Sequence, residues 1–411
     1  MSNWLLKIRS NSVARNSAAL FALQLVNMIA PLVVLPYLAR VLGVEAFGLV
    51  MLSFSASAIA YIVTDFGFNL SATYEISKRR DDRAYVNELL GAILLIKLGL
   101  CLLLFLCIFM YSYFIGFGTG GLTLPIYISL NVLVQAFLPT WFFQGIEKMK
   151  NVTICIVLAK ISYVFLVFLF INSKSDVNEV ILFYAVSNLV AVSVAISAIY
   201  YNGYAIKAPR TVKITDVFKD SSQFFLSRAA VSIYTSASTF LVGAFAGVQQ
   251  AAIYGASEKI YQASQSITAP IAQALFPYMA KSKNNKLIKK VVVYIGVPLF
   301  SGCILVGLWA NEIMGLIFGD EFLLSGGILQ VFLVVTVINF VGVNFGYPAF
   351  AGIDKVHIAN YTVILGAIVQ AVCLFLLFMT DSFSAFSVVS SVLITELVIM
   401  ITRIVIYNKY V

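Results

Sequence analysis

Eight charged side chains lie inside long apolar stretches of this sequence. A charge at the centre of a lone membrane helix costs about 2.5–3.5 kcal/mol on insertion scales, so such side chains should face a polar interior. Basic groups there could bind an anion, and acidic groups could pair with cations or exchange protons. The eight residues are Asp65, Lys97, Lys160, Arg228, Glu258, Lys259, Glu396 and Arg403.

Arg228 has the spacing of a substrate-binding residue. Ser232 and Thr235 follow it at i+4 and i+7, on the same face of a helix. A guanidinium can hold two phosphate oxygens at once, so Arg228 is a candidate contact for an anionic substrate. The alternative is an arginine that extends its charged end to the inner interface.

A second polar face is formed by Glu258, Gln262 and Gln265, again at i, i+4 and i+7. Three long polar side chains on one face indicate a water-lined surface rather than lipid contact. Lys259 lies about 100° around the same helix. Glu258 either pairs with a cation such as Arg228 or Lys160, or is a protonatable group coupled to transport.

The other intramembrane charges leave both structural and functional interpretations open. Lys97 and Lys160 suggest a cationic chamber, or pair across helices with Asp65 or Glu258. Asp65 lies near a span end, where it could be interfacial. Glu396 shares a helix face with Arg403, which we expect to extend to the interface. Gln24 and Asn27 add polar groups to the first span, ahead of Pro31 and Pro36.

The elements that position these residues must be membrane helices. Of the 411 residues, 61% are hydrophobic and 11% are charged, whereas soluble domains carry about 25% charged residues. The apolar runs are continuous and about 20 residues long, as in spanning helices rather than alternating barrel strands. We expect about twelve spans: 16–39, 46–68, 88–113, 123–143, 152–172, 179–201, 221–246, 251–276, 290–310, 326–347, 358–379 and 384–407.

The basic residues predict the orientation. With the N-terminus inside, 20 of the 27 lysines and arginines fall in inner segments and two, Arg40 and Lys174, in outer connectors. This bias predicts that both termini are cytoplasmic. The net charge of +9 therefore reports topology and a contact for anionic lipid heads rather than nucleic-acid binding.

A weak internal repeat divides the chain. Arg15-Asn16-Ser17 and Lys219-Asp220-Ser221 open the first and seventh spans, and Gly43-Val44 and Gly247-Val248 follow those spans. Both pairs are 204 residues apart. We therefore expect two parallel six-helix bundles, 1–205 and 206–411, an arrangement found in transporters.

Cofactor chemistry has little support in the sequence. The five cysteines all lie in apolar runs without a CxxC pair, and there is a single histidine, His357. Neither a disulfide framework nor a His/Cys metal site is expected, and we predict no cofactor.

Four stretches resemble the Wzx-type O-antigen flippases, a polysaccharide transporter family of the MATE-like flippase superfamily. The resemblance covers nearly the whole chain, although Tyr74 stands where the family pattern suggests an arginine. The stretches are Pro36–Gly43 running on to Phe47-Gly48, Asp65–Thr73, Trp141–Gly145 leading into Glu147-Lys148-Met149, and Leu316–Phe322.

The resemblance implies an all-α integral membrane fold of two six-helix bundles around a central cationic cavity, in a bacterial inner membrane. It implies transport of an undecaprenyl-pyrophosphate-linked oligosaccharide from the cytoplasmic to the periplasmic leaflet by alternating access. A coupling ion (H⁺ or Na⁺), membrane lipids and other polysaccharide-assembly proteins are expected partners. The family fixes no single set of binding residues.

Three other functions remain open. A multidrug or ion antiporter of the same superfamily would use acids to bind cationic drugs. A membrane-embedded polymerase or glycosyltransferase would need large outer loops with catalytic groups, whereas the connectors near 114–122 and 311–325 are short and lack a DxD pair. A non-catalytic scaffold would leave the intramembrane charges unexplained. We expect a transporter rather than an enzyme.

Overall fold

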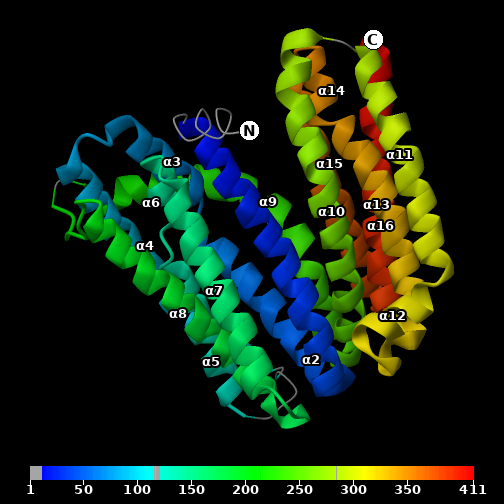
Figure 1. Ribbon diagram of the computed structural model, residues 1–411, viewed down its shortest axis with the longest axis horizontal. Helices are drawn as coiled ribbons and strands as arrows, with labels where there is room; N and C mark the ends of the chain where they lie inside the picture. Colours follow the sequence, from blue (N-terminus) through cyan, green and yellow to red (C-terminus); the bar gives the residue numbers. More distant parts are fainter. Residues whose placement is uncertain (1–11, 115, 117–120, 211, 284) are drawn as a thin grey trace, which may run out of the picture. The chain divides into compact units, whose positions relative to one another are not determined.

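A computed structural model describes residues 12–114, 116, 121–210, 212–283 and 285–411. It is helical, with no strand in that part of the chain. The all-α class is therefore confirmed. The helices, shown in Figure 1, are α2 (Ser12–Asp65), α3 (Phe68–Arg79), α4 (Arg83–Phe114), α5 (Thr123–Ala136), α6 (Thr140–Gly145), α7 (Met149–Phe170), η1 (Lys174–Asp176), α8 (Val177–Tyr201), α9 (Ile214–Ala246), α10 (Val248–Ser282), α11 (Asn285–Leu308), α12 (Ala310–Phe318), η2 (Asp320–Ser325), α13 (Gly326–Asn344), α14 (Tyr347–Gly352), α15 (Val356–Met379) and α16 (Ala385–Tyr410).

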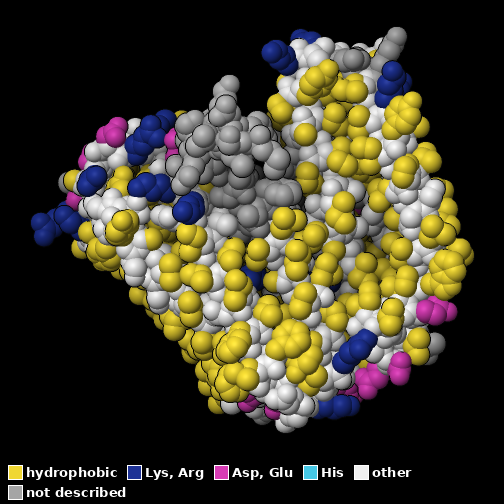
Figure 2. Space-filling view, viewed as in Figure 1, with side chains coloured by type: hydrophobic (Ala, Val, Ile, Leu, Met, Phe, Trp, Pro, Cys, Tyr) yellow, Lys and Arg dark blue, Asp and Glu magenta, His cyan; other side chains and the backbone are white. Residues whose placement is uncertain are grey.

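The surfaces of these helices require lipid. Leu102 of α4 and Phe165 of α7 are each 65% exposed, and hydrophobic side chains are spread over the face seen in Figure 2, where charged side chains gather toward its ends. Within the described residues, nine helical segments are long and apolar enough to cross a membrane, and one of them, Gln24–Arg79, runs through two predicted spans. The chain is a multi-pass membrane protein, and the count of twelve spans stays a prediction.

The chain forms two compact units. Unit 1 contains the residues up to Ala30 together with Ser53–Ile233, and unit 2 contains Pro31–Leu52 together with Tyr234–Val411. In unit 1, α8 packs against α5 and α7. In unit 2, α13 packs against α10, α11 and α16. The expected division into halves 1–205 and 206–411 remains a prediction.

Two glycines turn the chain between consecutive spans. The helical backbone of α2 is interrupted at Gly43, which has φ 75° and ψ 173°. Gly247 separates α9 from α10 with φ 94° and ψ 164°. Positive φ favours glycine, which explains why the same residue stands at both turns. The pair that suggested a repeat in the sequence thus has one backbone conformation.

A second repeated feature is a turn that follows a broken helix in each unit. Gly145-Ile146-Glu147-Lys148 begins at the last residue of α6, and Gly352-Ile353-Asp354-Lys355 begins at the last residue of α14, 207 residues later. We call these segments the inner turns. Their acidic residues have φ 59° and 58°. The amide of Lys148 donates to Phe143 O and that of Lys355 to Phe350 O, both at 2.8 Å.

Each inner turn ties two other helix ends together. Its acid forms an ion pair with a cation at the end of an earlier helix: Glu147 with Arg80 at 3.2 Å, and Asp354 with Lys283. Its lysine contacts the end of a later helix. Lys148 donates a hydrogen bond to Asn202, and Lys355 lies 3.2 Å from the ring centroid of Tyr410.

The segment between α8 and α9 is fixed to α4 by hydrogen bonds. The Asn87 side chain accepts from Ala205 N at 2.8 Å, and Asn87 O accepts from Lys207 N at 3.2 Å. Glu88 Oε2 accepts from the amides of Arg210 and Val212, at 3.0 and 3.1 Å. This connecting segment, 203–210 together with Val212, is therefore a bound part of unit 1.

Candidate functional site

A cluster of aromatic rings and one lysine lies among α2, α7 and α8 in unit 1. The Lys160 ammonium is 5.2 Å from the ring centroid of Tyr184. Phe54 and Tyr163 each lie 5.1 Å from the same ring, centroid to centroid. A cation within about 6 Å of an aromatic face is attracted by the ring quadrupole. We call Phe54, Lys160, Tyr163 and Tyr184 the aromatic–lysine cluster.

Buried polar groups accompany this cluster on the same helices or their neighbour. Ser57 Oγ and Tyr163 OH are buried and have no hydrogen-bond partner among the described residues. Asn131 of α5 accepts from Asn188 at 3.1 Å through Oδ1, while its buried Nδ2 is likewise unpartnered. A buried unsatisfied polar group costs about 1–3 kcal/mol. These groups would be stabilised by a polar molecule such as water or a hydroxyl-bearing ligand.

Helix spacing explains why these residues gather. Ser57 follows Phe54 by three positions, Tyr163 follows Lys160 by three, and Asn188 follows Tyr184 by four. Side chains three or four apart lie on one face of a helix. The prediction of Lys160 as a site residue depended on its charge alone. The aromatic and amide partners were missed, although these spacings were visible in the sequence.

Lys97 has a different environment, at a break between helices. It is 1% exposed, and its ammonium donates to Ala136 O, at the end of α5, at 2.9 Å. It also lies 5.8 Å from the Phe68 ring centroid. Because the last carbonyls of a helix lack intrahelical partners, Lys97 stabilises the end of α5. Its predicted substrate contact stays a prediction.

Asp65 lies in the same region and links three helices. It is 7% exposed and accepts a hydrogen bond from Asn69 Nδ2 at 2.5 Å. Asn69 in turn accepts from Thr140 Oγ1, at the start of α6, at 2.9 Å. The Asp65 carboxylate acts electrostatically on Lys97. Asp65 is therefore buried at the junction of α2, α3 and α6, and its position near the membrane interface stays a prediction.

The polar face predicted on α10 is made of hydrogen-bonded groups in unit 2. Glu258 Oε2 accepts from Thr239 Oγ1 at 2.7 Å. Lys259 donates to Gln262 at 2.9 Å, and Gln265 donates to Tyr261 OH at 2.7 Å. The structure thus pairs Lys259 with Gln262 and gives Glu258 a hydroxyl partner. The assignment of Lys259 and Gln262 to substrate binding is a prediction.

The second intramembrane acid of unit 2 also accepts from a neutral group. Glu396 Oε2 lies 3.2 Å from Asn339 Nδ2. Arg403, expected at the interface, is 7% exposed and donates to Thr362 Oγ1 and to Gly342 O, at 2.9 and 2.8 Å. That expectation was wrong because α13 ends at Asn344, leaving a late carbonyl for the guanidinium.

Three predicted substrate contacts have no described partner in the site. Gln24 and Asn27 are exposed on α2. The side chain of Arg228, like those of Ser232 and Thr235, lies outside the described residues, although α9 includes their positions. The structure therefore brings Lys97 and Asp65 together and places Lys160 in a separate cluster.

Comparisons with known proteins agree with this architecture. The family described as "Polysaccharide biosynthesis protein" matches residues 13–283. A Shigella dysenteriae protein named "Putative O-antigen transporter" is 31% identical over 94% of this chain and 98% of its own length. A flippase of Haloferax volcanii, named for low-salt glycan biosynthesis, is 22% identical over 77% of this chain and 67% of its own length.

Solved structures show the same fold at low sequence identity. A MATE-family multidrug transporter of the MOP superfamily in its inward-facing conformation has a TM-score of 0.68 and 16% identity, covering 94% of both chains. A Pyrococcus furiosus MOP-superfamily transporter, described as having a binding pocket of reversed polarity, has a TM-score of 0.54 and 14% identity, covering 98% of this chain and 96% of its own. With a MATE-like fold and a family match over most of its length, the chain belongs to the polysaccharide biosynthesis protein family.

Proposed function

We propose that this protein flips a lipid-linked oligosaccharide from the cytoplasmic to the periplasmic leaflet of the bacterial inner membrane by alternating access. The relatives are named as transporters or flippases, and the chain is a polysaccharide flippase of this class rather than an enzyme. The lipid carrier, an undecaprenyl pyrophosphate, and the cytoplasmic placement of both termini are part of the proposal.

The aromatic–lysine cluster is the observation that supports this substrate most directly. An ammonium group binds phosphate oxygens, and the apolar faces of tyrosine and phenylalanine can cover the C–H faces of a sugar ring. The unpartnered Ser57, Tyr163 and Asn131 groups could exchange hydrogen bonds with sugar hydroxyls. Together these groups suit a molecule with an anion and many hydroxyls.

The physical barrier to be removed is the cost of moving a polar head through hydrocarbon. Burying unpaired hydroxyls and charges costs several kcal/mol per group, roughly, on transfer scales. Fixed cations and hydrogen-bonding side chains lower that cost, while the lipid tail stays in the bilayer. We propose Arg228, Lys97, Gln24, Asn27, Lys259 and Gln262 as further contacts of the head, and Glu258, Glu396 and Asp65 as ion-pairing or coupling groups.

A reconstituted flipping assay tests the proposal. Proteoliposomes carrying a fluorescent lipid-linked oligosaccharide should show protein-dependent movement of the label between leaflets. Lys160→Ala should lower the flipping rate about tenfold, the effect of losing one charge-assisted contact of about 1.4 kcal/mol. Lys150→Ala is a matched control, because Lys150 is exposed at the start of the same helix, α7.

The outcomes separate the candidate functions. Transport of cationic drugs without movement of the lipid-linked sugar would assign the chain to the multidrug class instead. Sugar polymerisation by the purified protein would assign it to the polymerase class. Equal flipping rates for Lys160→Ala and Lys150→Ala would remove the aromatic–lysine cluster from the substrate path.

A further inference from the structure

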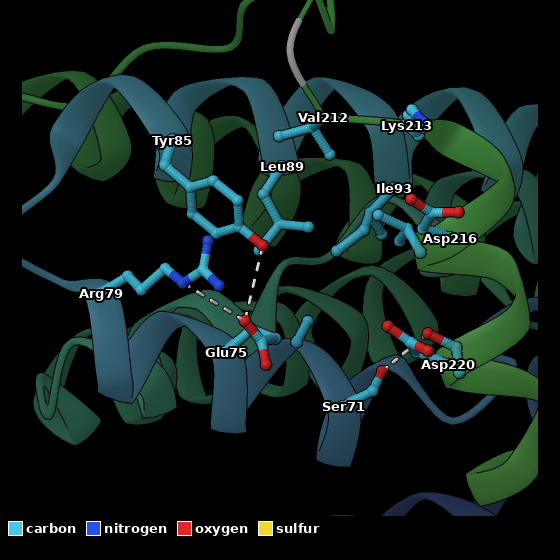
Figure 3. Close-up of a pocket in the computed structure, with 13 residues that line it drawn as sticks. Ser71, Glu75, Arg79, Tyr85, Leu89, Ile93, Val212, Lys213, Asp216 and Asp220 are labelled. Atoms are coloured by element: carbon cyan, nitrogen blue, oxygen red, sulfur yellow. Dashed lines mark hydrogen bonds and ion pairs between the residues drawn. The ribbon is translucent and has the colours of Figure 1, made fainter.

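Unit 1 contains a cavity away from the aromatic–lysine cluster, between α3, α4 and the beginning of α9. It encloses about 250 Å³ and is shown in Figure 3. Residues of α3 and α4 form one side, and residues of α9 and the end of the connecting segment form the other. We call it the inner cavity, because the predicted orientation places these helix ends at the cytoplasmic side of the membrane.

The α3 side of the cavity is organised around one arginine. The Arg79 guanidinium forms an ion pair with Glu75 at 3.8 Å and lies 4.4 Å from the ring centroid of Tyr85. Tyr85 OH donates to Glu75 Oε2 at 3.5 Å. Since guanidinium has five N–H donors, Arg79 can hold Glu75 and still donate to an anion in the cavity.

The α9 side carries two carboxylates and a lysine. Asp216 and Asp220, four residues apart, line the cavity with Lys213, and neither aspartate forms an ion pair with another described residue. The Asp220 carboxylate acts electrostatically on Tyr85 on the opposite side. The helix dipole stabilises an acid in the first turn, which accounts for Asp216 but falls off before Asp220.

The acids that line the inner cavity are too far apart to bind one metal ion together, but they could bind a larger cation. Among the described residues, no group of three or more acids, histidines or cysteines is close enough to hold a metal ion. Glu75, Asp216 and Asp220 nevertheless surround one cavity. A primary ammonium group is larger than a bare ion and carries three N–H donors, so it can interact with carboxylates spread around a cavity.

Apolar residues form the deep part of the cavity and flank it. Leu89 is 2% exposed and Ile93 is fully buried. On the outer surface of the same α9 turns, Ile214 and Phe218 are 40% and 42% exposed. The cavity therefore combines carboxylates, cations and apolar surface at one helix end, which suits an amphipathic zwitterion.

The side formed by the connecting segment is held in place before any ligand arrives. Val212 N donates to Glu88 at 3.1 Å, beside Lys213. Ser221, which is 1% exposed, shares a hydrogen bond of 2.7 Å with Ser71 across the cavity floor. A preorganised site binds with a smaller loss of conformational entropy.

We propose that the inner cavity binds a phosphoethanolamine group, as carried by the phosphatidylethanolamine of the inner leaflet. The ammonium interacts with Asp216, Asp220 and Glu75, and the phosphate with Lys213 and Arg79. The acyl chains lie on the exposed apolar residues of α9. This site is independent of the substrate proposed above, because it requires only a membrane lipid.

Native mass spectrometry of the full-length protein from mixed-lipid nanodiscs tests this site. Wild-type protein should retain phosphatidylethanolamine about tenfold more than phosphatidylcholine, whose quaternary ammonium has no N–H donors, since each charge-assisted hydrogen bond is worth about a factor of ten. The double variant Asp216→Asn/Asp220→Asn should lose this preference. Asp81→Asn is the matched control, being exposed at the same membrane side and outside the cavity lining.

Each outcome decides the proposal. Equal retention of the two lipids by wild-type protein, or an unchanged preference in the double variant, overturns it without reference to flipping. Competition by soluble phosphoethanolamine at millimolar concentration would identify the free headgroup as a sufficient ligand, and its absence would assign the site to the membrane lipid. Single variants at Asp216 and Asp220, with thermal unfolding of each, separate loss of the site from loss of the fold.

Discussion

Two lysines of unit 1 and two glutamates of unit 2 have different kinds of partner. In unit 1, Lys97 donates to a helix carbonyl and Lys160 lies against a tyrosine ring. In unit 2, Glu258 and Glu396 each accept from an uncharged side chain. Lys160 of unit 1 can therefore attract an anionic molecule, whereas Glu258 and Glu396 of unit 2 are carboxylates that could exchange a proton. The difference suggests a division between binding the head and coupling its movement.

A second difference lies within unit 1, between its two lysines. Lys97 is held by the end of a broken helix, whereas Lys160 is half-buried in a cluster with unpartnered polar atoms nearby. The contacts of Lys97 are structural, whereas the surroundings of Lys160 include polar atoms that could still bind a ligand. Substitution of Lys97 should therefore lower the stability of the protein, whereas substitution of Lys160 should lower transport.

The largest effect is expected from Lys97→Met. This change leaves Ala136 O without its charged donor, and a buried polar group left unsatisfied costs about 1–3 kcal/mol. The protein should unfold at a lower temperature in detergent, and less of it should reach the membrane. Lys160→Met should retain the wild-type unfolding temperature within about 2 °C and lose transport instead.

These two variants decide whether the lysines differ as described. Equal thermal stability of both would contradict the structural role of Lys97. A large loss of stability in Lys160→Met would instead show that its cation–ring contact supports the fold.

An intermediate effect is expected from Glu258→Gln. The amide cannot change its charge, so flipping in proteoliposomes should no longer respond to an imposed pH gradient, and the driven rate should fall to the rate measured without a gradient. The basal rate without a gradient should change little. Glu312→Gln, a change in an exposed acid at the start of α12, serves as the control.

Thr239→Val gives a second test of whether the Glu258 carboxylate couples flipping to the pH gradient. It removes the hydroxyl that donates to Glu258 while keeping the carboxylate. Because the carboxylate remains able to exchange a proton, flipping should still respond to the pH gradient. A response to the gradient that survives in Glu258→Gln would place coupling elsewhere, with Glu396→Gln as the next variant to measure.

The smallest effects are expected at the inner turns. Glu147→Ala and Asp354→Ala each remove one exposed ion pair, worth about 0.2–1 kcal/mol. Each variant should lower the unfolding temperature by a similar, small amount, because the two turns make equivalent contacts. A change of several degrees in only one variant would show that one turn contributes more to stability than its counterpart.

The sequence alone predicted the helical class and the spans that carry most intramembrane charges, because long apolar runs and buried cations are visible without contacts. It did not predict the partners of Lys97 and Arg403. Those partners depend on helix ends at Ala136 and Asn344, inside or beside stretches that the apolar pattern predicts as single spans. Pro139 and Gly346, which stand at these breaks, were the available signals.

The internal repeat was likewise only partly detected from the sequence. The 204-residue spacing of Gly43 and Gly247 was detectable because the residues are identical. The 207-residue spacing of the inner turns was missed although three of their four residues are identical, and the structure shows that Glu147 and Asp354 both adopt the left-handed conformation. The aromatic–lysine cluster was missed because it combines four side chains from three helices.

The connecting segment between α8 and α9 has a practical consequence for handling the protein. Long exposed loops are the usual sites of proteolytic nicking, since a protease must draw several extended residues into its cleft. In this segment the amides of Ala205, Lys207, Arg210 and Val212 are all engaged by α4. Despite the exposed lysine and arginine it contains, the segment should resist trypsin until α4 itself loosens, so separate half-proteins cannot be prepared by simple digestion.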